Sequence, residues 1–481
     1  MMRVALLLPA LFVLPACGGD GASGRPEPRP GDRPIVLITL DTTRADMLGA
    51  YGSTAGVTPR LDELARAGVV FDNAYAPMPQ TLPSHATMLT GLMPRAHGAL
   101  ENMYVLDDRF ETMASSAGRR GYATGAFIGA LAIEAATGVD NGFETFDQPR
   151  GEWNEDRKGH PPQRKAQEVT DAALAWADSL DGDRPYLLWA HYYDPHGDDN
   201  RSFKPPKRHY DAVEPAVAQR EVDARRQRFG DLKPKGGLPT FWRGYLAELR
   251  YTDEQVGLLL DGLDERGLLD DAIIVVVGDH GEGLYEHGEK GHGTHLWEEM
   301  LRVPLFVVHP DGTGAGRRVA ARVVLQDIEP TVKHMAMGQV QSKRHELLGV
   351  DLWAAVLSEN EPPERPVFLE RPHYGEERIQ WRGQGRLQYG FLTAVLDGRH
   401  KLVREPDGST TLYDLEADPD ELVDISTQDP EASARLTALI EAWLVDCPSD
   451  DPGSGSQVEA GSEREEALRQ LGYLGGGEDD G

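Results

Sequence analysis

Asp41, Thr81, Asp279 and His280 are the residues of this chain whose types and settings best suit chemistry. Asp41 ends the apolar run PIVLITLD, and Asp279 and His280 follow the apolar run AIIVVVG. Carboxylates and an imidazole can coordinate a divalent cation, and a hydroxyl beside that cation can attack an ester. The pattern therefore predicts a metal site with its own nucleophile, suited to an anionic ester.

Each of these residues also has a purely structural interpretation. Asp41 begins DTTRAD and could cap the element that follows it. Thr81 begins TLPSHATMLTG, where it could cap a helix or mark a helix N-terminus that favours an anion. Asp279 and His280 could form a simple turn beside a solvated histidine. Because carboxylates end two separate apolar runs, we prefer metal binding for Asp41 and Asp279, while the pattern alone leaves Thr81 open.

Five histidines are concentrated in the two short segments HYYDPHG and EHGEKGHGTH, namely His191, His196, His287, His292 and His295. Such a concentration in an acidic chain indicates substrate contact, a second cation or acid catalysis. His196 and His292 have the most suitable neighbours, a proline and two glycines respectively. We expect one of them to protonate the leaving oxygen. Asn102 and Lys290 are further candidates for contacts with the anionic substrate.

The elements that must position these residues follow an α/β pattern. Strands are expected at 34–40, 123–128, 185–190, 272–277 and 303–308, and helices at 58–68, 167–180 and 245–263. This alternation is typical of a parallel sheet covered by helices on both faces, with ligands bound beyond the carboxyl ends of the strands. Segment 200–240 is charged and rich in proline, and we expect a surface excursion or lid near the active face.

The N-terminal residues predict export. Residues 1–17 are typical of a signal peptide whose apolar run is too short and too interrupted by proline to span a membrane. Leu14-Pro15-Ala16-Cys17 is similar to a bacterial lipoprotein cleavage box, and a plain signal cut near Ala16 is the alternative. Residues 18–33 form a flexible linker. We expect a periplasmic or cell-surface protein, anchored to a membrane only through a lipid on Cys17.

The rest of the chain divides by composition. Residues 34–385 are expected to form the catalytic domain, and 386–447 a small α+β subdomain of short antiparallel strands followed by a helix near 430–445. Residues 448–481 form a low-complexity tail. The 481 residues are 40% apolar, enough for a packed core, and carry a formal net charge of −30. That charge argues against a nucleic-acid partner and requires a local positive site for an anionic substrate.

Six segments, in this order, resemble the sulfatase family of the alkaline-phosphatase superfamily: LITLDTTRADMLGAYG, TLPSHATMLTG, HYYDPH, VVVGDHGE, GHGTHLWEEMLRVPLFV and LYDLEADPDE. The resemblance covers residues 34 to 445, most of the chain. It implies a mixed, mostly parallel sheet between helices, followed by a small C-terminal subdomain with a short antiparallel sheet. It also implies that Asp41, Asp279 and His280 bind one divalent metal ion and that Thr81 stands where the nucleophile stands.

The chain departs from the family pattern around that nucleophile. The family motif is Cys (or Ser)-x-Pro-x-Arg, with the Cys oxidised to formylglycine, whereas this chain has Thr81-Leu82-Pro83-Ser84-His85. Because threonine is not a substrate for that oxidation, no formylglycine is expected. Thr42 replaces the second Asp of the usual pair, and His85 replaces the Arg as a substrate-binding candidate. The Lys-x-His segment of the family has no counterpart near 126–132.

These departures favour phosphate chemistry. A formylglycine hydrate expels sulfate with its second hydroxyl, which Thr81 lacks, so its ester must be broken by water or passed to an acceptor. Thr nucleophiles occur at this place in related phosphodiesterases and phospho-transferases. We therefore expect a metal-dependent hydrolase of a sulfate or phosphate ester, with phosphate favoured, acting on a small-molecule, glycan or lipid-headgroup substrate. The ligands favour Mn or Zn, with Ca possible.

Two other functions remain open from the sequence. A transferase would use the same Thr81 ester but discharge it onto an envelope lipid or glycan. A binding protein would keep the fold without catalysis, as the loss of the second Asp, the Arg and the Lys-x-His segment suggests. The survival of Thr81, Asp279 and His280 argues against that second alternative.

Overall fold

The computed structural model describes residues 29, 31–102, 104–149, 163–197, 203–230, 232, 237–288, 290–340, 349–358, 360–371 and 391–447. The predicted signal peptide with Cys17, residues 18–28 of the linker and the tail over 448–481 lie outside the described residues. Within those ranges, no helix has the length and apolar character needed to cross a membrane.

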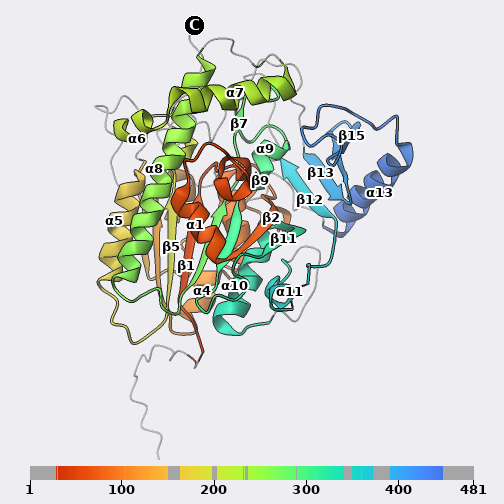
Figure 1. Cartoon of the computed structure of the whole chain (residues 1–481). Coiled ribbons are helices and arrows are strands. Elements are labelled where there is room, and N and C mark those ends of the chain that lie inside the picture. The colour runs from red at the N-terminus through yellow and green to blue at the C-terminus, as the bar shows by residue number, and fades with distance from the viewer. Residues whose placement is uncertain are drawn as a thin grey trace, which may run out of the picture.

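A mixed nine-stranded sheet forms the centre of the molecule (Figure 1). Its order is β11-β2-β10-β6-β1-β5-β3-β4, with β9 paired to β2. The strands are β1 (Ile35–Leu40), β2 (Val69–Tyr75), β3 (Ala123–Ile128), β4 (Thr145–Asp147), β5 (Tyr186–Tyr192), β6 (Ile273–Gly278), β9 (Arg302–Val303), β10 (Leu305–Val308) and β11 (Arg318–Val324). Strand β1 pairs in parallel with β5 and β6, while β10 is antiparallel to β6 and β2. The expected mixed, mostly parallel sheet is confirmed.

The fully buried strands are those that the apolar runs predicted. Every residue of β1, β5 and β6 is buried, because helices cover both faces of the sheet and leave no solvated side. The run at 303–308 divides at Pro304 into β9 and β10, since proline cannot donate to a ladder. Strands β2, β4 and β11 were not expected. Strand β11 lies at the end of the sheet order and includes exposed positions, so its sequence lacks a continuous apolar run.

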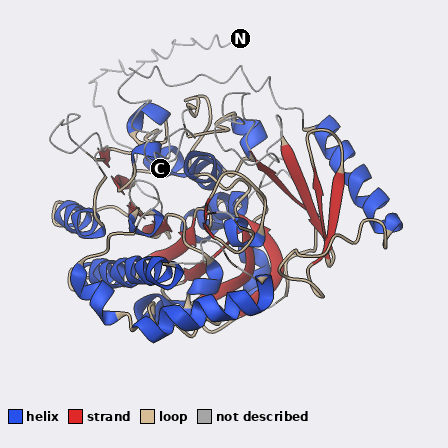
Figure 2. Ribbon diagram, turned by 90° about the horizontal axis from the view of Figure 1, so that it is seen from above, coloured by secondary structure: helices blue, strands red, loops and turns tan. Residues whose placement is uncertain are grey.

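Helices cover both faces of the sheet (Figure 2). They are α1 (Pro59–Ala67), α2 (Thr81–Thr90), α3 (Pro94–His97), α4 (Met113–Gly118), α5 (Ala166–Ala177), α6 (Lys207–Ala212), α7 (Pro215–Phe229), α8 (Leu238–Asp264), α9 (Glu298–Leu301), α10 (Ile328–Met337), α11 (Trp353–Leu357) and α13 (Pro430–Asp446). Alternate residues of β1 point to opposite faces. Ile35 and Leu37 belong to an apolar cluster with residues of α2, α4 and α10, whereas Val36 and Ile38 belong to one with α1, α5 and α8.

The described part of segment 200–240 forms helices α6 and α7. Val213, Ala218 and Val222 of this segment share an apolar cluster with Trp242 of α8 and with Leu284, which follows β6 in the chain. Leu284 belongs to a two-stranded sheet of β7 (Gly283–Leu284) and β8 (Lys290–Gly291). The predicted surface excursion is therefore helical and lies beside the segment that leaves the central sheet after β6.

A second, antiparallel sheet forms the C-terminal part of the fold and lies beside the central sheet (Figure 1). Its order is β12-β13-β14-β15, over Val367–Arg371, Leu392–Asp397, His400–Arg404 and Thr410–Asp414, and α13 packs on it. The short antiparallel strands and the helix after them are as predicted. Strand β12 precedes residue 386, so this sheet begins earlier in the chain than the predicted subdomain. The Nε of Arg228 in α7 lies 2.7 Å from Asp420, which follows β15.

Candidate active site

Asp41, Asp279 and Thr81 meet at one edge of the central sheet. Asp41 follows β1 directly and Asp279 follows β6, and these two strands are parallel neighbours in register. Their carboxyl ends therefore lie together, which is where ligands bind in sheets of this kind. Asp41, Asp279 and His280 each offer one ligand atom, and these atoms lie within 4.8 Å of one another.

The donor atoms of this cluster fit a divalent metal ion. Both carboxylate oxygens of Asp41 and the Oδ2 of Asp279 are buried and accept no hydrogen bond from the described residues. The Nδ1 of His280 lies 2.9 Å from the carbonyl oxygen of Gly281 and must donate to it, which leaves the lone pair on Nε2. That Nε2 lies 3.6 Å from the Oδ2 of Asp279. Buried carboxylate oxygens without a donor are costly unless they coordinate a cation.

The pKa shifts of the cluster follow mainly from burial. Burial raises the pKa of Asp41 well above its usual value, and the nearby Glu282 carboxylate raises it further. Burial and the charge of Asp41 likewise raise the pKa of Asp279. Burial, with His292 next in size, lowers the pKa of His280. A divalent cation bound here would favour the ionised form of both carboxylates and the neutral form of the imidazole.

Thr81 stands beside the cluster as the first residue of α2. Its Oγ1 lies 3.3 Å from the Nε2 of His280, and the residue is fully buried. The N–H of Leu82 donates to the Oδ1 of Asn102 at 2.8 Å, which brings the Asn102 amide to the same helix N-terminus. The Nδ2 of Asn102 is buried and donates to none of the described residues. The Asn102 amide therefore lies where a hydrogen-bond donor to an oxyanion beside Thr81 is expected.

The rings of His196 and His292, the two candidates for the general acid, also lie near this site. The ring centroid of His292 lies 4.4 Å from that of His280 and 5.0 Å from that of His196. All three rings are buried. The Nδ1 of His196 lies 2.8 Å from the Tyr193 hydroxyl, and the Nδ1 of His292 lies 3.4 Å from the Oε2 of Glu282. Lys290 is two residues from His292 but is exposed.

His85 follows Thr81 by four residues in α2 and is buried beside the cluster, with its Nδ1 3.8 Å from the Oδ2 of Asp279. Its Nδ1 lies 2.8 Å from the Thr81 carbonyl oxygen and its Nε2 lies 3.2 Å from the Oγ1 of Thr39. Burial, with His191 next in size, keeps the pKa of His85 well below its usual value. Because both ring nitrogens are engaged by the protein, the predicted substrate contact of His85 does not fit this placement. Its position suits a residue that orients Thr81.

Two further buried residues, Thr39 and Glu282, lie close to the cluster without having been predicted as site residues. Thr39 lies two residues before Asp41, so the two side chains leave the same face of β1. The single hydroxyl in an otherwise apolar strand, on the same face as Asp41, was the sequence feature that could have identified Thr39 as a site residue. Glu282 is buried next to the cluster, only 1% exposed, and contacts His292. The motif Gly-Asp-His-Gly-Glu already contained this residue, which was the available indication.

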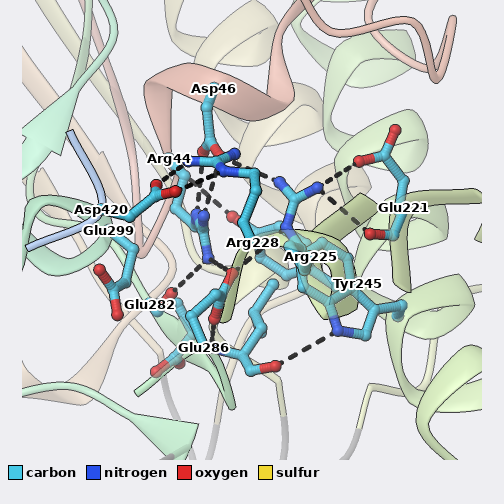
Figure 3. A network of polar contacts seen from close by, with 12 residues as sticks. Arg44, Asp46, Glu221, Arg225, Arg228, Tyr245, Glu282, Glu286, Glu299 and Asp420 are labelled. Atoms are coloured by element: carbon cyan, nitrogen blue, oxygen red, sulfur yellow. Dashed lines mark hydrogen bonds and ion pairs between the residues drawn. The ribbon is translucent and has the colours of Figure 1, made fainter. Parts of the chain in front are cut away.

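An ionic network whose members are mostly buried lies at the segment that follows Asp41 in the chain (Figure 3). Arg44 pairs with Asp46 at 2.8 Å and with Glu286 at 2.5 Å. Arg225, from α7, pairs with the same Asp46 at 3.0 Å, with Glu286 at 3.4 Å and with Glu221 at 2.6 Å. Two arginines thus share two carboxylates, which ties α7 to the segments that follow β1 and β6.

The same network supports an unusual backbone conformation at Thr42. The Tyr245 hydroxyl, shown in Figure 3, donates to the Thr42 carbonyl at 2.9 Å and accepts from the N–H of Arg44 at 3.3 Å. Thr42 has φ of 48°, a left-handed conformation that costs free energy for a branched residue. In this conformation its N–H donates to the Oδ1 of Asp279 at 3.0 Å. The strained residue therefore orients one carboxylate of the cluster.

Comparison with known protein families matches residues 33–338 to the family Sulfatase. Among curated proteins, the chain is 25% identical to the N-acetylglucosamine-6-O-sulfatase of Bacteroides thetaiotaomicron, over 94% of this chain and 93% of that protein. It is 24% identical to an arylsulfatase of Clostridium perfringens, over 87% of this chain and 95% of the relative.

Solved structures share the fold. One, in complex with its substrate D-glucosamine-2-N,6-O-disulfate, superposes with a TM-score of 0.70 at 21% identity, over 88% of this chain and 100% of the other. The phosphonate monoester hydrolase of Agrobacterium radiobacter gives a TM-score of 0.65 at 24% identity, over 86% and 95%. The family match covers well over half of the chain and includes Asp41, Thr81, Asp279 and His280. The chain therefore belongs to the sulfatase family of hydrolases, within the alkaline-phosphatase-like superfamily.

Proposed function

We propose that this chain is an extracytoplasmic, metal-dependent hydrolase that cleaves a phosphate ester or diester with Thr81 as its nucleophile. The observation that carries the proposal is the distance of 3.3 Å between the Thr81 Oγ1 and the Nε2 of His280, beside two buried carboxylates that lack donors. A cation held by Asp41, Asp279 and His280 would have the Thr81 hydroxyl among its neighbours. The predicted signal peptide supports export, and Cys17 is the proposed site of a lipid anchor.

The chemistry follows from the positions of the side chains. A divalent cation bound by Asp41, Asp279 and His280 would supply Lewis-acid chemistry, which stabilises negative charge on the reacting oxygens. Thr81 releases its proton to water, its oxygen bonds to phosphorus, and the bond from phosphorus to the leaving oxygen breaks. Water then adds to phosphorus, the bond to the Thr81 oxygen breaks, and the hydroxyl is restored.

Four further side chains are candidates for parts in this scheme. His196 or His292 gives a proton to the leaving oxygen, since the His292 ring lies beside His280 and the His196 ring lies beside His292. The Nδ2 of Asn102 donates to a non-bridging oxygen of the transferred group, because this amide is buried at the same helix N-terminus and has its donor to spare. Lys290, being exposed, is left with at most a distal contact to an anionic substrate.

The choice of phosphorus over sulfur rests on the nucleophile. Threonine cannot be converted to formylglycine, so the second hydroxyl that expels sulfate from an ordinary sulfatase is missing. The curated relatives named above are sulfatases, and a sulfate ester of a sugar or small alcohol is the alternative substrate. The ligand set supports Mn or Zn over Ca, because an imidazole nitrogen suits those metals better than an ion that takes oxygen ligands.

A substrate panel tests the proposal. The purified chain would be given an aryl sulfate, a phosphate monoester, a phosphate diester and a phosphonate ester, each with Mn, Zn and Ca. We expect the phosphorus esters to turn over fastest, with Mn or Zn. Faster turnover of the aryl sulfate would contradict the phosphate preference while leaving the hydrolase intact. An added alcohol would detect a transferase, and failure with every substrate despite bound metal would favour a binding protein.

A further inference from the structure

The Thr39 hydroxyl is the meeting point of three buried nitrogen groups beneath the metal ligands. Its Oγ1 lies 2.9 Å from the Nε1 of Trp189, 2.9 Å from the Nδ1 of His191 and 3.2 Å from the Nε2 of His85. Thr39, Trp189 and His191 are completely buried, and His85 is 1% exposed. The groups contact one another directly, so their protons can be placed by counting donors and acceptors.

The count begins at His85. Its Nδ1 lies 2.8 Å from a carbonyl oxygen, that of Thr81, which can only accept, so this nitrogen carries the proton. A fully buried imidazole is neutral, so the Nε2 of His85 has a lone pair and accepts the Thr39 hydroxyl proton. The two lone pairs of that hydroxyl then receive the N–H of Trp189 and the Nδ1–H of His191.

One consequence of this count is an unprotonated Nε2 on His191. That nitrogen lies 3.4 Å from the Oδ2 of Asp41, and neither atom has a hydrogen-bond partner among the described residues. A nitrogen lone pair and an ionised carboxylate oxygen that face each other in a buried place repel unless a cation lies near both, or unless the carboxyl keeps its own proton and donates it to the nitrogen. The other oxygen of Asp41 faces the Nε2 of His280 at 4.0 Å. Asp41 thus has an imidazole lone pair on each side.

The opposite arrangement of protons fails at Thr81. If His191 carried its proton on Nε2, the Thr39 hydroxyl would have to donate to the Nδ1 of His191. His85 would then have to donate to Thr39 through Nε2, and its Nδ1 lone pair would face the Thr81 carbonyl oxygen at 2.8 Å. Two acceptors at that distance are strongly unfavourable.

We propose that Thr39 is a positioning residue, whose hydroxyl holds one tautomer of His85 and one of His191 so that an unprotonated Nε2 of His191 faces Asp41 at the metal site. This proposal rests on the proposed function, because it concerns the same metal. His191 would support the cation together with the three cluster residues, either directly or through a donor between it and Asp41. Partners of this kind orient ligands, and their loss typically lowers metal affinity by about 10–100-fold.

A set of matched variants tests Thr39. Thr39→Val keeps the shape and removes the hydroxyl, while Thr39→Ser keeps the hydroxyl. Thr124→Val removes a comparably buried hydroxyl near the start of β3, whose contacts are the Gly142 carbonyl at 2.9 Å and the Glu144 N–H at 2.8 Å. Each metal-free protein would be titrated with Zn or Mn by calorimetry, and its folded fraction measured by thermal unfolding.

We expect Thr39→Val to raise the metal Kd about 10–100-fold, Thr39→Ser to stay within about threefold, and Thr124→Val to match the wild type however its stability changes. A Thr39→Val protein that is less stable but binds metal with wild-type affinity would reduce Thr39 to a structural role and overturn the proposal. A Thr39→Ser protein that binds metal as weakly as Thr39→Val would also overturn the proposal.

Should Thr39→Val fail to fold, His191→Phe removes the same lone pair and keeps a planar ring. The expected loss of affinity is the same, and wild-type affinity in that variant would overturn the proposal. The metal Kd is measured without any turnover of substrate. A wild-type chain that binds metal but cleaves no ester would contradict the proposed function while the Thr39 comparison still stands, whereas a wild-type chain that binds no metal would contradict both.

Discussion

The Thr81 Oγ1 lies 3.3 Å from the Nε2 of His280, although 199 residues of chain separate them. The contact arises because β1 and β6 are parallel neighbours, so that Asp41 and His280 reach the same edge of the sheet. Helix α2 then begins at that edge with Thr81. A nucleophile, two carboxylates and an imidazole are thereby brought together by backbone topology before any ligand binds.

Asn102 provides a test of transition-state stabilisation. Asn102→Asp keeps an oxygen to accept the N–H of Leu82, now 2.8 Å from Oδ1, but replaces the Nδ2 donor with a negative charge. Loss of one such donor lowers kcat by about 10²–10³, and we expect that loss with little change in metal content. Steady-state kinetics would measure it. Asn73→Asp is the control, because that side chain is partly exposed and hydrogen-bonds only to the Ala320 carbonyl among the described residues. A wild-type kcat in Asn102→Asp would show that Asn102 does not stabilise the transition state.

The general acid is identified by leaving-group dependence. Replacing the acid by alanine should lower kcat by about 10²–10⁴ for an alkyl leaving group, and by much less for a nitrophenol, which needs no proton to leave. His196→Ala and His292→Ala would be compared with both substrates. The variant with the large, leaving-group-dependent loss lacks the acid. If neither shows a difference between the two substrates, protonation by these histidines is not part of the reaction.

The metal-free protein should lose stability as pH rises. Burial and Glu282 raise the pKa of Asp41, and burial and Asp41 raise that of Asp279, so the folded chain keeps protons that the unfolded chain releases above about pH 4. Stability is then greatest while these carboxyls are protonated and falls as pH passes through their raised pKa values. Asp279→Asn should remove part of this decline and should abolish metal binding.

Denaturant unfolding at about pH 5 and pH 8, with chelator present, would measure this effect. Buried histidines such as His280 have lowered pKa values and destabilise the fold in acid, but they do so in both proteins and cancel in the difference. The free energy of unfolding of Asp279→Asn should be higher than that of the metal-free wild type, and this difference should be larger at pH 8 than at pH 5. An equal or smaller excess at pH 8 would contradict the raised pKa of Asp279.

The ionic network of Figure 3 predicts a stability effect remote from the chemistry. After Arg225→Met, Glu286 and Asp46 keep their ion pairs with Arg44, while Glu221 loses its pair with Arg225. A buried charge left without any partner costs about 3–5 kcal/mol. Because Arg44 remains and the Asp46 side chain is 43% exposed, we expect a smaller loss in the free energy of unfolding, but one above the roughly 0–1 kcal/mol of an exposed pair. Arg266→Met breaks an exposed pair with Asp178 and should change little. Equal effects in the two variants would contradict a special role for the network.

Much of this architecture could be predicted from the sequence because its strongest determinants are local. Continuous apolar runs identify β1, β5 and β6, and a carboxylate at the end of such a run identifies Asp41 and Asp279. Strand β11 could not be predicted, because its exposed and half-buried residues resemble a loop. The charge and proline content of segment 200–240 suggested a lid. In the structure, α7 of this segment is stabilised by apolar contacts with Trp242 of α8, which the composition of the segment does not reveal.

The orientation of side chains was the least predictable feature. His85 stands where the family has an arginine, and the sequence suggested a substrate contact. In the structure its ring turns inward, because the Thr81 carbonyl and the Thr39 hydroxyl, 46 residues away in the chain, satisfy both nitrogens. Such a contact depends on tertiary packing between β1 and α2, which no local pattern encodes.

The most direct test of the central claim is the Thr81→Ala variant, assayed for turnover and for bound metal in the same sample. The account predicts turnover at or below the detection limit with metal content equal to wild type, because Asp41, Asp279 and His280 remain. Thr90→Ala, in the same helix with its hydroxyl bonded to the Ala86 carbonyl, should retain both. Turnover near the wild-type rate in Thr81→Ala would contradict the account.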